Sequence, residues 1–520
     1  MEHSILYKAY RAFCKVGWFL PGFILWAAFP PMGERGDVLF ALAPLMWLSR
    51  QGEVRRSVVA WTKSGLFFWV ATLSWMPAIV KNGGPWPLVG LGWFALAAYC
   101  TLYFAAYGYL SATYWRFANQ RRGLRLLGIL LVEPILWSGL ELTRSTLFGG
   151  FAWNPLGLVP INSGFASPAA LGGVYLCSAV IILINGTFAG IGERVIASLK
   201  RRPLNPWRTL ETLLAFLVVF GIYRAANLLE SGRREVSSGE LVNVALIQRN
   251  FPCCFQENRE NPIEVYDRLL GNVANLKPQL VVLPESAMAE IGPLNSSRTL
   301  QFLADLSQKA GGARVIAGGG RYERGKAYNS AISYPDLSIY DKVHLVPFGE
   351  FIPGDKLWPY LQRFAPVGSC TSGEKRLLGD FGVAICYEDT DSSLMREYAS
   401  MGAKALVFIT NDSWFSHSIE AEAHSWQAVA RAAETGLPVI RVGNSGVTGT
   451  ISRKLEANWL VDACGRPIVD KGASMFDRLE LKDAKAGPTW YVRLGDLPLL
   501  IAFLLLITSL IMIKYTHECE

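Results

Sequence analysis

Eight apolar stretches constrain this chain more than any other feature of its sequence. A helix needs about 20 apolar residues to cross a bilayer, and most of these stretches reach or approach that length. They lie at residues 18–33, 37–49, 58–80, 87–114, 126–148, 169–190, 209–228 and 497–513. Hydrophobic residues make up 51% of the 520 residues, more than a soluble enzyme normally carries. We therefore expect a membrane α-helical bundle of about eight spans.

Basic residues occur in alternate connections between these stretches, before the first and after the second, fourth and sixth. They are Lys8, Arg11, Lys15, Arg50, Arg55, Arg56, Arg116, Arg121, Arg122, Arg125, Arg194, Lys200, Arg201, Arg202 and Arg208. The opposite connections, near 81–86 and 149–168, contain only Lys81. The positive-inside rule then predicts that both termini are cytoplasmic and that the segment 230–495 is external. Membrane topology also explains the net charge of +8, so no nucleic-acid partner is expected.

The N-terminus has a basic patch and then an apolar stretch, as signal peptides do. No obvious small-residue cleavage site follows, so we interpret it as a retained first span. The alternative, that all the apolar stretches are buried helices of a large soluble protein, would not produce the alternating basic connections.

The segment between the last two apolar stretches has a different pattern, in which short apolar runs alternate with polar runs of helical period. Strands are expected at 242–248, 280–283, 315–318, 332–334, 381–386, 405–409, 439–442 and 449–452, and helices near 263–276, 297–310, 391–401 and 420–435. Such alternation indicates an α/β layered domain. We divide the chain into a transmembrane bundle at 1–229, an external catalytic domain at 230–495, and a final span with a short cytoplasmic tail at 496–520.

Three reactive side chains stand at or just past the ends of expected strands: Glu285 in QLVVLPES, Lys342 in SIYDKVHLVPFGE and Cys386 in FGVAICYED. Strand ends bring distant residues of an α/β fold into one crevice, so we expect the three to meet. A thiol is a poor nucleophile until it is deprotonated, and Glu285 can serve as the base. Lys342 can stabilise the oxyanion of a tetrahedral intermediate. Lys342 is also expected to lower the thiol pKa and so favour the thiolate.

Taken singly, each of these residues has an ordinary structural explanation: an inert core cysteine, a solvated loop carboxylate and a surface lysine. Cofactors are not indicated. The nine cysteines form no CxxC pair and the five histidines show no metal-ligand spacing, so no metal site is expected. The run GGG at 318–320 lacks the GxxxxGK[ST] pattern of a phosphate-binding loop.

The motifs LPES, YDKVHLVPFGE and CYED together resemble the Glu-Lys-Cys motifs of the nitrilase superfamily, the carbon-nitrogen hydrolases. The long lysine motif is similar to that of the bacterial apolipoprotein N-acyltransferases. Further matches are NDSWF at 411–415, ARAAETGLPVIRVGNSGVT at 430–448 and ELTRSTLFGGFAWNPLG at 141–157. The resemblance covers nearly the whole chain. It implies a nitrilase-like αββα sandwich inserted before the last span of an eight-span membrane part.

The resemblance implies a two-step acyl transfer. Cys386 would attack an ester of a membrane phospholipid, typically the sn-1 chain of phosphatidylethanolamine, giving a thioester and a lysophospholipid. The acyl chain would then pass to the α-amino group of the S-diacylglyceryl-cysteine at the N-terminus of a lipoprotein, the last step of lipoprotein maturation. The implied location is the bacterial inner membrane, with the catalytic domain on the periplasmic side.

The resemblance also assigns supporting residues. Glu350 and Glu388 match acidic positions around the family's active site, and Tyr387 lies beside the nucleophile. Trp153 matches a position near the lipid entrance, and Pro353 of the lysine motif is assigned to substrate binding. The ordinary alternatives are surface acids, a packed aromatic ring and an interfacial tryptophan belt.

Some positions depart from the family pattern. The external domain begins QRNFPCCFQEN, where Arg249 replaces a glycine of the usual Gln-Gly-Asn stretch and no tryptophan follows nearby. Ser416 stands for a glycine, and Leu437 stands for a basic residue. These departures do not touch Glu285, Lys342 or Cys386, and they indicate a divergent member.

Two other readings compete with the acyltransferase. A membrane-anchored amidase or nitrilase would use the same three residues and pass its acyl group to water. A transport or scaffold protein with a degenerate domain would need no chemistry. Transporters, however, commonly place polar or ionisable groups at mid-membrane, and apart from Lys63, Glu133 and Glu141 the expected spans contain little charge.

Overall fold

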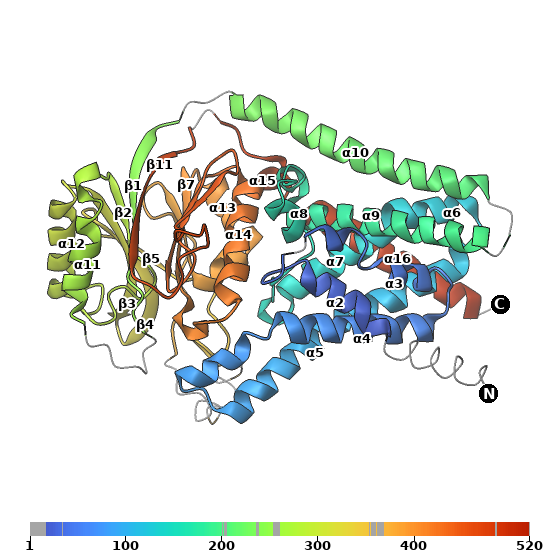
Figure 1. The fold of residues 1–520 in the computed structure, drawn as a ribbon, viewed down its shortest axis with the longest axis horizontal. Helices are drawn as coiled ribbons and strands as arrows, with labels where there is room; N and C mark the ends of the chain where they lie inside the picture. Colours follow the sequence, from blue (N-terminus) through green and yellow to red (C-terminus); the bar gives the residue numbers. More distant parts are fainter. Residues whose placement is uncertain are drawn as a thin grey trace. The chain divides into compact units, whose positions relative to one another are not determined.

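The computed structural model describes residues 17–33, 35–199, 201, 205–235, 239–252, 260–352, 354, 360, 369–483 and 486–518. The chain divides into two compact units, both traced in Figure 1. Unit 1 comprises Met1–Val80, Gly84–Leu229 and Leu494–Glu520, and unit 2 comprises Lys81–Gly83 and Glu230–Arg493.

The regular structure described for unit 1 is helical. Its main helices are α2 (Leu20–Ala27), α3 (Ala43–Ser49), α4 (Val54–Thr72), α5 (Trp86–Ala118), α6 (Arg122–Leu127), α7 (Glu133–Thr146), α8 (Leu158–Asn162), α9 (Ala169–Leu199), α10 (Pro206–Glu235) and α16 (Leu497–Glu518). When α-helices are counted together with the short helical turns that adjoin them, five segments are long and apolar enough to cross a membrane. They are Val54–Asn82, Trp86–Ala118, Arg122–Gly149, Ala169–Leu199 and Pro206–Glu230. The expected membrane bundle is therefore confirmed.

The expected number of eight spans is approximate. Within the described residues, the first and last predicted stretches correspond to the shorter apolar helices Gly17–Ala27 and Leu497–Ile513. The predicted span at 37–49 forms a short 3-10 turn, Arg35–Leu39, and then α3, with Pro44 in the first turn of α3. Seven helical residues rise only about 10 Å, so α3 alone is too short to cross the hydrocarbon core.

Glycines allow the helices of unit 1 to approach closely. A Cβ atom at Gly108 of α5 would lie 2.6 Å from the Trp61 ring of α4. A Cβ at Gly139 of α7 would lie 2.2 Å from the Phe503 ring, so the C-terminal helix α16 packs directly on α7. Small residues at such crossings are typical of membrane bundles, where close packing substitutes for hydrophobic collapse.

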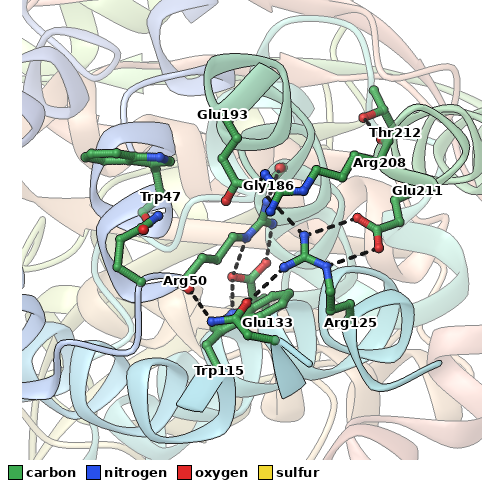
Figure 2. A network of polar contacts seen from close by, with 12 residues as sticks. Trp47, Arg50, Trp115, Arg125, Glu133, Gly186, Glu193, Arg208, Glu211 and Thr212 are labelled. Atoms are coloured by element: carbon green, nitrogen blue, oxygen red, sulfur yellow. Dashed lines mark hydrogen bonds and ion pairs between the residues drawn. The ribbon is translucent and has the colours of Figure 1, made fainter. Parts of the chain in front are cut away.

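A network of buried ion pairs joins several helices of unit 1 (Figure 2). Arg50 donates to both carboxylate oxygens of Glu133, at 3.2 and 2.7 Å, and to the carbonyl of Gly186 at 2.8 Å. Arg125 donates to both oxygens of Glu211 at 3.3 Å.

Two further contacts extend this network. Arg208 of α10 donates to Glu193 of α9 at 2.9 Å, and the Trp115 indole donates to Glu133 at 3.0 Å. Buried charges need such pairing, because an unpaired ion in an apolar environment is strongly unfavourable.

Unit 2 contains two β-sheets. The first has the strand order β11-β1-β2-β3-β4-β5 and the second has the order β10-β9-β8-β7-β6. The strands of the first sheet are β1 (Leu241–Gln248), β2 (Leu280–Val282), β3 (Arg314–Glu323), β4 (Lys326–Tyr334), β5 (Ser338–Asp341) and β11 (Ala473–Glu480). Those of the second are β6 (Phe381–Ile385), β7 (Ala405–Asn411), β8 (Val439–Asn444), β9 (Gly449–Ile451) and β10 (Ala457–Trp459). Strands β1, β2 and β3 run parallel, as do β6, β7 and β8.

Helices cover the outer faces of the two sheets, which confirms the expected αββα sandwich (Figure 1). Helices α11 (Pro262–Gly271) and α12 (Ser297–Lys309) share a core with the first sheet. Helices α13 (Ser392–Ser400) and α14 (Glu420–Thr435) pack on the second. Capping fixes the helix starts: the side chain of Ser296 accepts from Thr299 N, and that of Asp391 accepts from Leu394 N.

The expected strands and helices of this segment all occur, with ends shifted by a few residues. Three strands were not expected: β5, β10 and β11. Much of β10 is exposed, and β11 lies at the edge of its sheet and has several partly exposed positions. A strand with little burial lacks the apolar alternation by which strands are recognised.

Candidate active site

The three reactive residues follow three different strands of unit 2, as expected. Glu285 comes shortly after β2, Lys342 directly after β5, and Cys386 directly after β6. Cys386 opens a short 3-10 turn, Cys386–Thr390, and has a left-handed backbone with φ 53°. A residue other than glycine rarely adopts this conformation, and such strain is concentrated at functional sites.

A single carboxylate, Glu388, joins the cysteine turn to the lysine segment. It accepts a hydrogen bond at 2.8 Å from Ile385 N, at the end of β6. From the other segment it accepts bonds from Val343 N at 2.7 Å, His344 N at 3.0 Å and the Tyr340 hydroxyl at 2.8 Å. Glu388 is fully buried, so these four donors replace its water shell. Its side chain therefore holds the lysine segment against the turn that begins with Cys386.

The Lys342 ammonium group is buried with a carboxylate beside it. Its Nζ atom lies 3.0 Å from each carboxylate oxygen of Glu350, and its side chain is 1% exposed. Glu350 is held in turn by Val346 N, which donates to Oε2 at 2.8 Å. Burial alone would lower the pKa of Lys342, but the charges of Glu350 and Glu285 outweigh it, and the net pKa is raised. Lys342 is therefore a permanent cation in the site.

Glu285 is a buried carboxyl group whose pKa is raised to about 7. Burial is the largest cause; the charge of Lys342 lowers this pKa, and the charge of Glu350 raises it. Gly318 of β3 makes room for this segment, because a Cβ there would lie 2.7 Å from Glu285 Cα. A carboxyl group with a pKa near neutrality can both accept and return a proton, as general acid–base catalysis requires.

Sequence reasoning missed Asn329 of β4, which connects two of these carboxyl groups. Its Nδ2 atom donates to Glu285 Oε1 and to Glu350 Oε1, each at 2.7 Å. Asn329 thus fixes the position of Glu285 relative to the Lys342–Glu350 pair. The sequence gives no local signal for this role, because the contact depends on how β4 pairs with its neighbours.

Lys342 acts on the Cys386 thiol in the expected direction, but it does not set the net shift of the thiol pKa. The pKa of the Cys386 thiol is raised well above its usual value, first by burial and then by the charge of Glu285. Lys342 lowers this pKa, as expected, but by less than the other two raise it. The Cys386 side chain is therefore a neutral thiol in this environment, and it would need a base in order to act as a nucleophile.

A second buried polar cluster supports the turn that follows Cys386. Asp389 pairs with His424 at 2.9 Å and with Arg441. The other ring nitrogen of His424 lies 3.2 Å from Asp412 and 3.4 Å from Glu420. Asp412, Glu420 and His424 offer atoms close enough together to hold a metal ion, but the Arg441 guanidinium, 3.7 Å from Asp412, already supplies positive charge there. These residues are best explained as structural ion pairs.

The remaining predicted residues lie in different places. Tyr387 belongs to the turn after Cys386, and its carbonyl accepts from the Thr390 hydroxyl at 2.8 Å. Trp153 is buried in unit 1, where its ring lies 5.4 Å from that of Trp75. Pro353 lies outside the described residues.

Comparisons with known proteins point to one family over most of the chain. The family model described as "Apolipoprotein N-acyltransferase N-terminal domain" matches residues 21–187, and that described as "Carbon-nitrogen hydrolase" matches residues 243–470. The apolipoprotein N-acyltransferase of Geobacter metallireducens is 30% identical over 462 residues, covering 84% of each chain. That of Photobacterium profundum is 28% identical over 505 residues, covering 91% of this chain and 90% of its own.

Among solved structures, a carbon-nitrogen hydrolase from Helicobacter pylori G27 aligns with 47% of this chain and 90% of its own. The identity is 17% and the TM-score is 0.35.

Proposed function

Because this chain belongs to the apolipoprotein N-acyltransferase family, we propose that it acylates lipoproteins through a thioester on Cys386. The family membership makes it a membrane acyltransferase of lipoprotein maturation, with lipid and lipoprotein substrates. One observation carries the finer proposal. Glu285, with its pKa near 7, and the buried Lys342 cation act electrostatically on the neutral Cys386 thiol.

In the first half-reaction, Glu285 accepts the thiol proton as the sulfur attacks the ester carbonyl carbon of a phospholipid. Lys342 stabilises the negative charge that develops on the carbonyl oxygen. When the tetrahedral intermediate collapses, the ester C–O bond breaks and Glu285 returns the proton to the departing oxygen. The products are an acyl thioester on Cys386 and a lysophospholipid.

In the second half-reaction, the α-amino group of a diacylated lipoprotein attacks the thioester carbonyl. Glu285 accepts a proton from the amine, and Lys342 again stabilises the oxyanion. The C–S bond then breaks, the thiol is regenerated with that proton, and the lipoprotein carries a new amide. If water attacked the thioester in place of the amine, the same residues would act as a hydrolase. The identity of the acceptor therefore distinguishes a transferase from an amidase.

We further propose phosphatidylethanolamine as the acyl donor and the bacterial inner membrane as the location. The basic residues between alternate apolar stretches, such as Arg55 and Arg56 in the first turn of α4 and Arg121 and Arg122 at the start of α6, support cytoplasmic termini and an external catalytic domain at 230–495. This orientation presents Cys386 on the side where exported lipoproteins carry their N-termini.

The test uses membranes containing the full-length protein and phosphatidylethanolamine with a labelled sn-1 chain. The protein should gain a label that hydroxylamine removes, and Cys386→Ala should abolish it. Cys464→Ala is the matched control, because Cys464 is an exposed free cysteine, and this variant should keep the label. Adding a diacylated lipopeptide should move the label to its amine. Absence of label on the wild-type protein would overturn the thioester, and release only as free fatty acid would indicate a hydrolase.

A further inference from the structure

Arg249, which occupies a position where the resembling family often has glycine, is a buried cation next to the loop that carries Glu285. It follows β1 directly, and its side chain is 2% exposed. Its Nη2 atom donates to Glu290 Oε2 at 2.5 Å. The guanidinium group also lies 5.2 Å from the Phe251 ring and 5.6 Å from the Tyr266 ring. A buried guanidinium with an ion pair and two aromatic faces has a defined position.

These contacts reach the 285–291 loop at two points. Glu290 belongs to the loop itself, five residues after Glu285. Tyr266, against which Arg249 packs, has a hydroxyl 3.4 Å from the carbonyl of Ala287. On the other side, Met288 N donates to the carbonyl of Gly318 in β3 at 3.2 Å. The loop is thus held by the sheet on one side and by the Arg249 contacts on the other.

The segment that carries Arg249 is itself well anchored. Phe251 N donates to Asn444 Oδ1 and its carbonyl accepts from Asn444 Nδ2, both at 2.9 Å. Asn444 also donates to Asn411 Oδ1 at 2.9 Å, which ties the segment to the ends of β7 and β8. Arg249 therefore connects a fixed part of the second sheet to the loop of the general base. A glycine at this position has no side chain with which to make this connection.

We propose that Arg249 is a positioning residue that holds the 285–291 loop, and with it the Glu285 carboxyl group, through its ion pair with Glu290. The assignment rests on the proposed function for its effect on catalysis, but its effect on the loop is independent of that function. Arg249 acts through Glu290 and Tyr266 and is not assigned any contact with substrate.

Three consequences follow from this role. Arg249→Gly should loosen the loop, lower kcat for thioester formation about tenfold or more, and leave the KM for phospholipid nearly unchanged. Burial is the largest cause of the raised pKa of Glu285, so admitting water should move the acidic limb of the rate–pH profile to lower pH. The groups that act on Glu285, namely Lys342, Glu350, Asn329 and Asp412, are unchanged in this variant.

The experiment is hydrogen–deuterium exchange of the full-length protein in detergent, read on peptides that cover residues 285–291, together with thioester formation as a function of pH. Arg249→Gly should increase exchange in these peptides, and Glu290→Gln, altered at the more exposed end of the pair, should do so to a smaller extent. The charge reversal Arg249→Glu with Glu290→Arg should restore slower exchange. Arg268→Gly is the matched control, because Arg268 faces Glu260 at 4.0 Å with both side chains 65% exposed.

The outcomes separate the two proposals. If Arg249→Gly leaves both the exchange of residues 285–291 and the pH profile unchanged, the positioning role is wrong. If it increases exchange but the wild-type protein forms no Cys386 thioester, the proposed function fails and the loop assignment stands. If Arg249→Gly exchanges faster throughout unit 2, the result for Glu290→Gln is used instead. Wild-type exchange of residues 285–291 in Glu290→Gln would then overturn the positioning role of Arg249.

Discussion

The buried charges of unit 1 and those of the candidate active site are arranged by opposite rules. In the described bundle network, three guanidinium groups face three carboxylates: the buried Arg50 with Glu133, Arg125 with Glu211, and the partly exposed Arg208 with Glu193. In the described part of the active site, three carboxyl groups, those of Glu285, Glu350 and Glu388, act on one ammonium group, Lys342. The first set is balanced, and the second has a surplus of acid.

This difference separates a structural role from a chemical one. A matched set of buried ions leaves no charge of the network without a partner, so it can hold helices together. In the surplus set, Lys342 pairs directly with Glu350, and Glu388 is occupied by four hydrogen-bond donors. Glu285 remains as the acid with a pKa of about 7. Burial is the largest cause of this raised pKa, and the charge of Glu350 adds to it, so Glu285 has the pKa that suits the proposed base for the Cys386 thiol.

The largest effect is expected when one charge of the bundle network is removed without its partner. Arg50→Met should leave Glu133 buried without its partner and destabilise unit 1 by about 3–5 kcal/mol. Thermal unfolding in detergent should show the loss. The double variant Arg50→Met with Glu133→Met should recover most of it, because it removes both charges. A single variant as stable as the wild type would show that the network is not structural.

Removing the positive charge of Lys342 from the candidate active site should lower the rate of thioester formation. Lys342→Met keeps the length of the side chain but removes the charge that we propose stabilises the oxyanion, so thioester formation should fall about 10²–10³-fold. The rate should be measured by single-turnover labelling with phosphatidylethanolamine. A variant that retains near-normal rates would remove Lys342 from the mechanism.

A smaller effect on turnover is expected when one of the three carboxyl groups around Lys342 loses its charge. Glu350→Gln keeps a polar partner for Lys342 but removes one negative charge, and a charge-assisted hydrogen bond contributes about 1.5–3 kcal/mol. We expect turnover to fall about tenfold or more, and we expect thermal stability to fall less than in Arg50→Met, because a polar side chain still faces Lys342. A loss of stability in proportion to the loss of rate would assign Glu350 to folding.

The smallest effect is expected for Asn329, whose replacement should shift the pH dependence of the rate in one direction. Since Glu285 must be ionised to act as a base, the wild-type rate should rise with pH up to about 7 and then level off. The hydrogen bond from Asn329 lowers the pKa of Glu285, so Asn329→Leu should raise that pKa and move the acidic limb to higher pH. If the limb moves up by one pH unit, the rate at pH 7 would fall about fivefold, because the ionised fraction of Glu285 would drop from about one half to about one tenth. A limb that moves to lower pH would contradict this account.

Much of the fold and part of the site followed from the sequence for a simple reason. Apolar stretches, strand runs and the segments around Glu285, Lys342 and Cys386 are local patterns, and strand ends place such residues predictably. Asn329 and the Arg249–Glu290 pair were missed because each contact joins segments about 40 residues apart. The lowering effect of Lys342 on the pKa of Cys386 was predicted, but the net rise in that pKa was not, because burial is a property of the folded domain.

Glu388 also limits how this site can be altered by evolution or design. Since one carboxylate bonds to both Ile385 N and the Tyr340–His344 segment, an insertion or deletion in either segment would displace donors that belong to the other. The two stretches must therefore be inherited together, with their internal lengths unchanged. Loops that do not contact Glu388 can vary in sequence and length. Transferring this site to another protein scaffold would require both segments together.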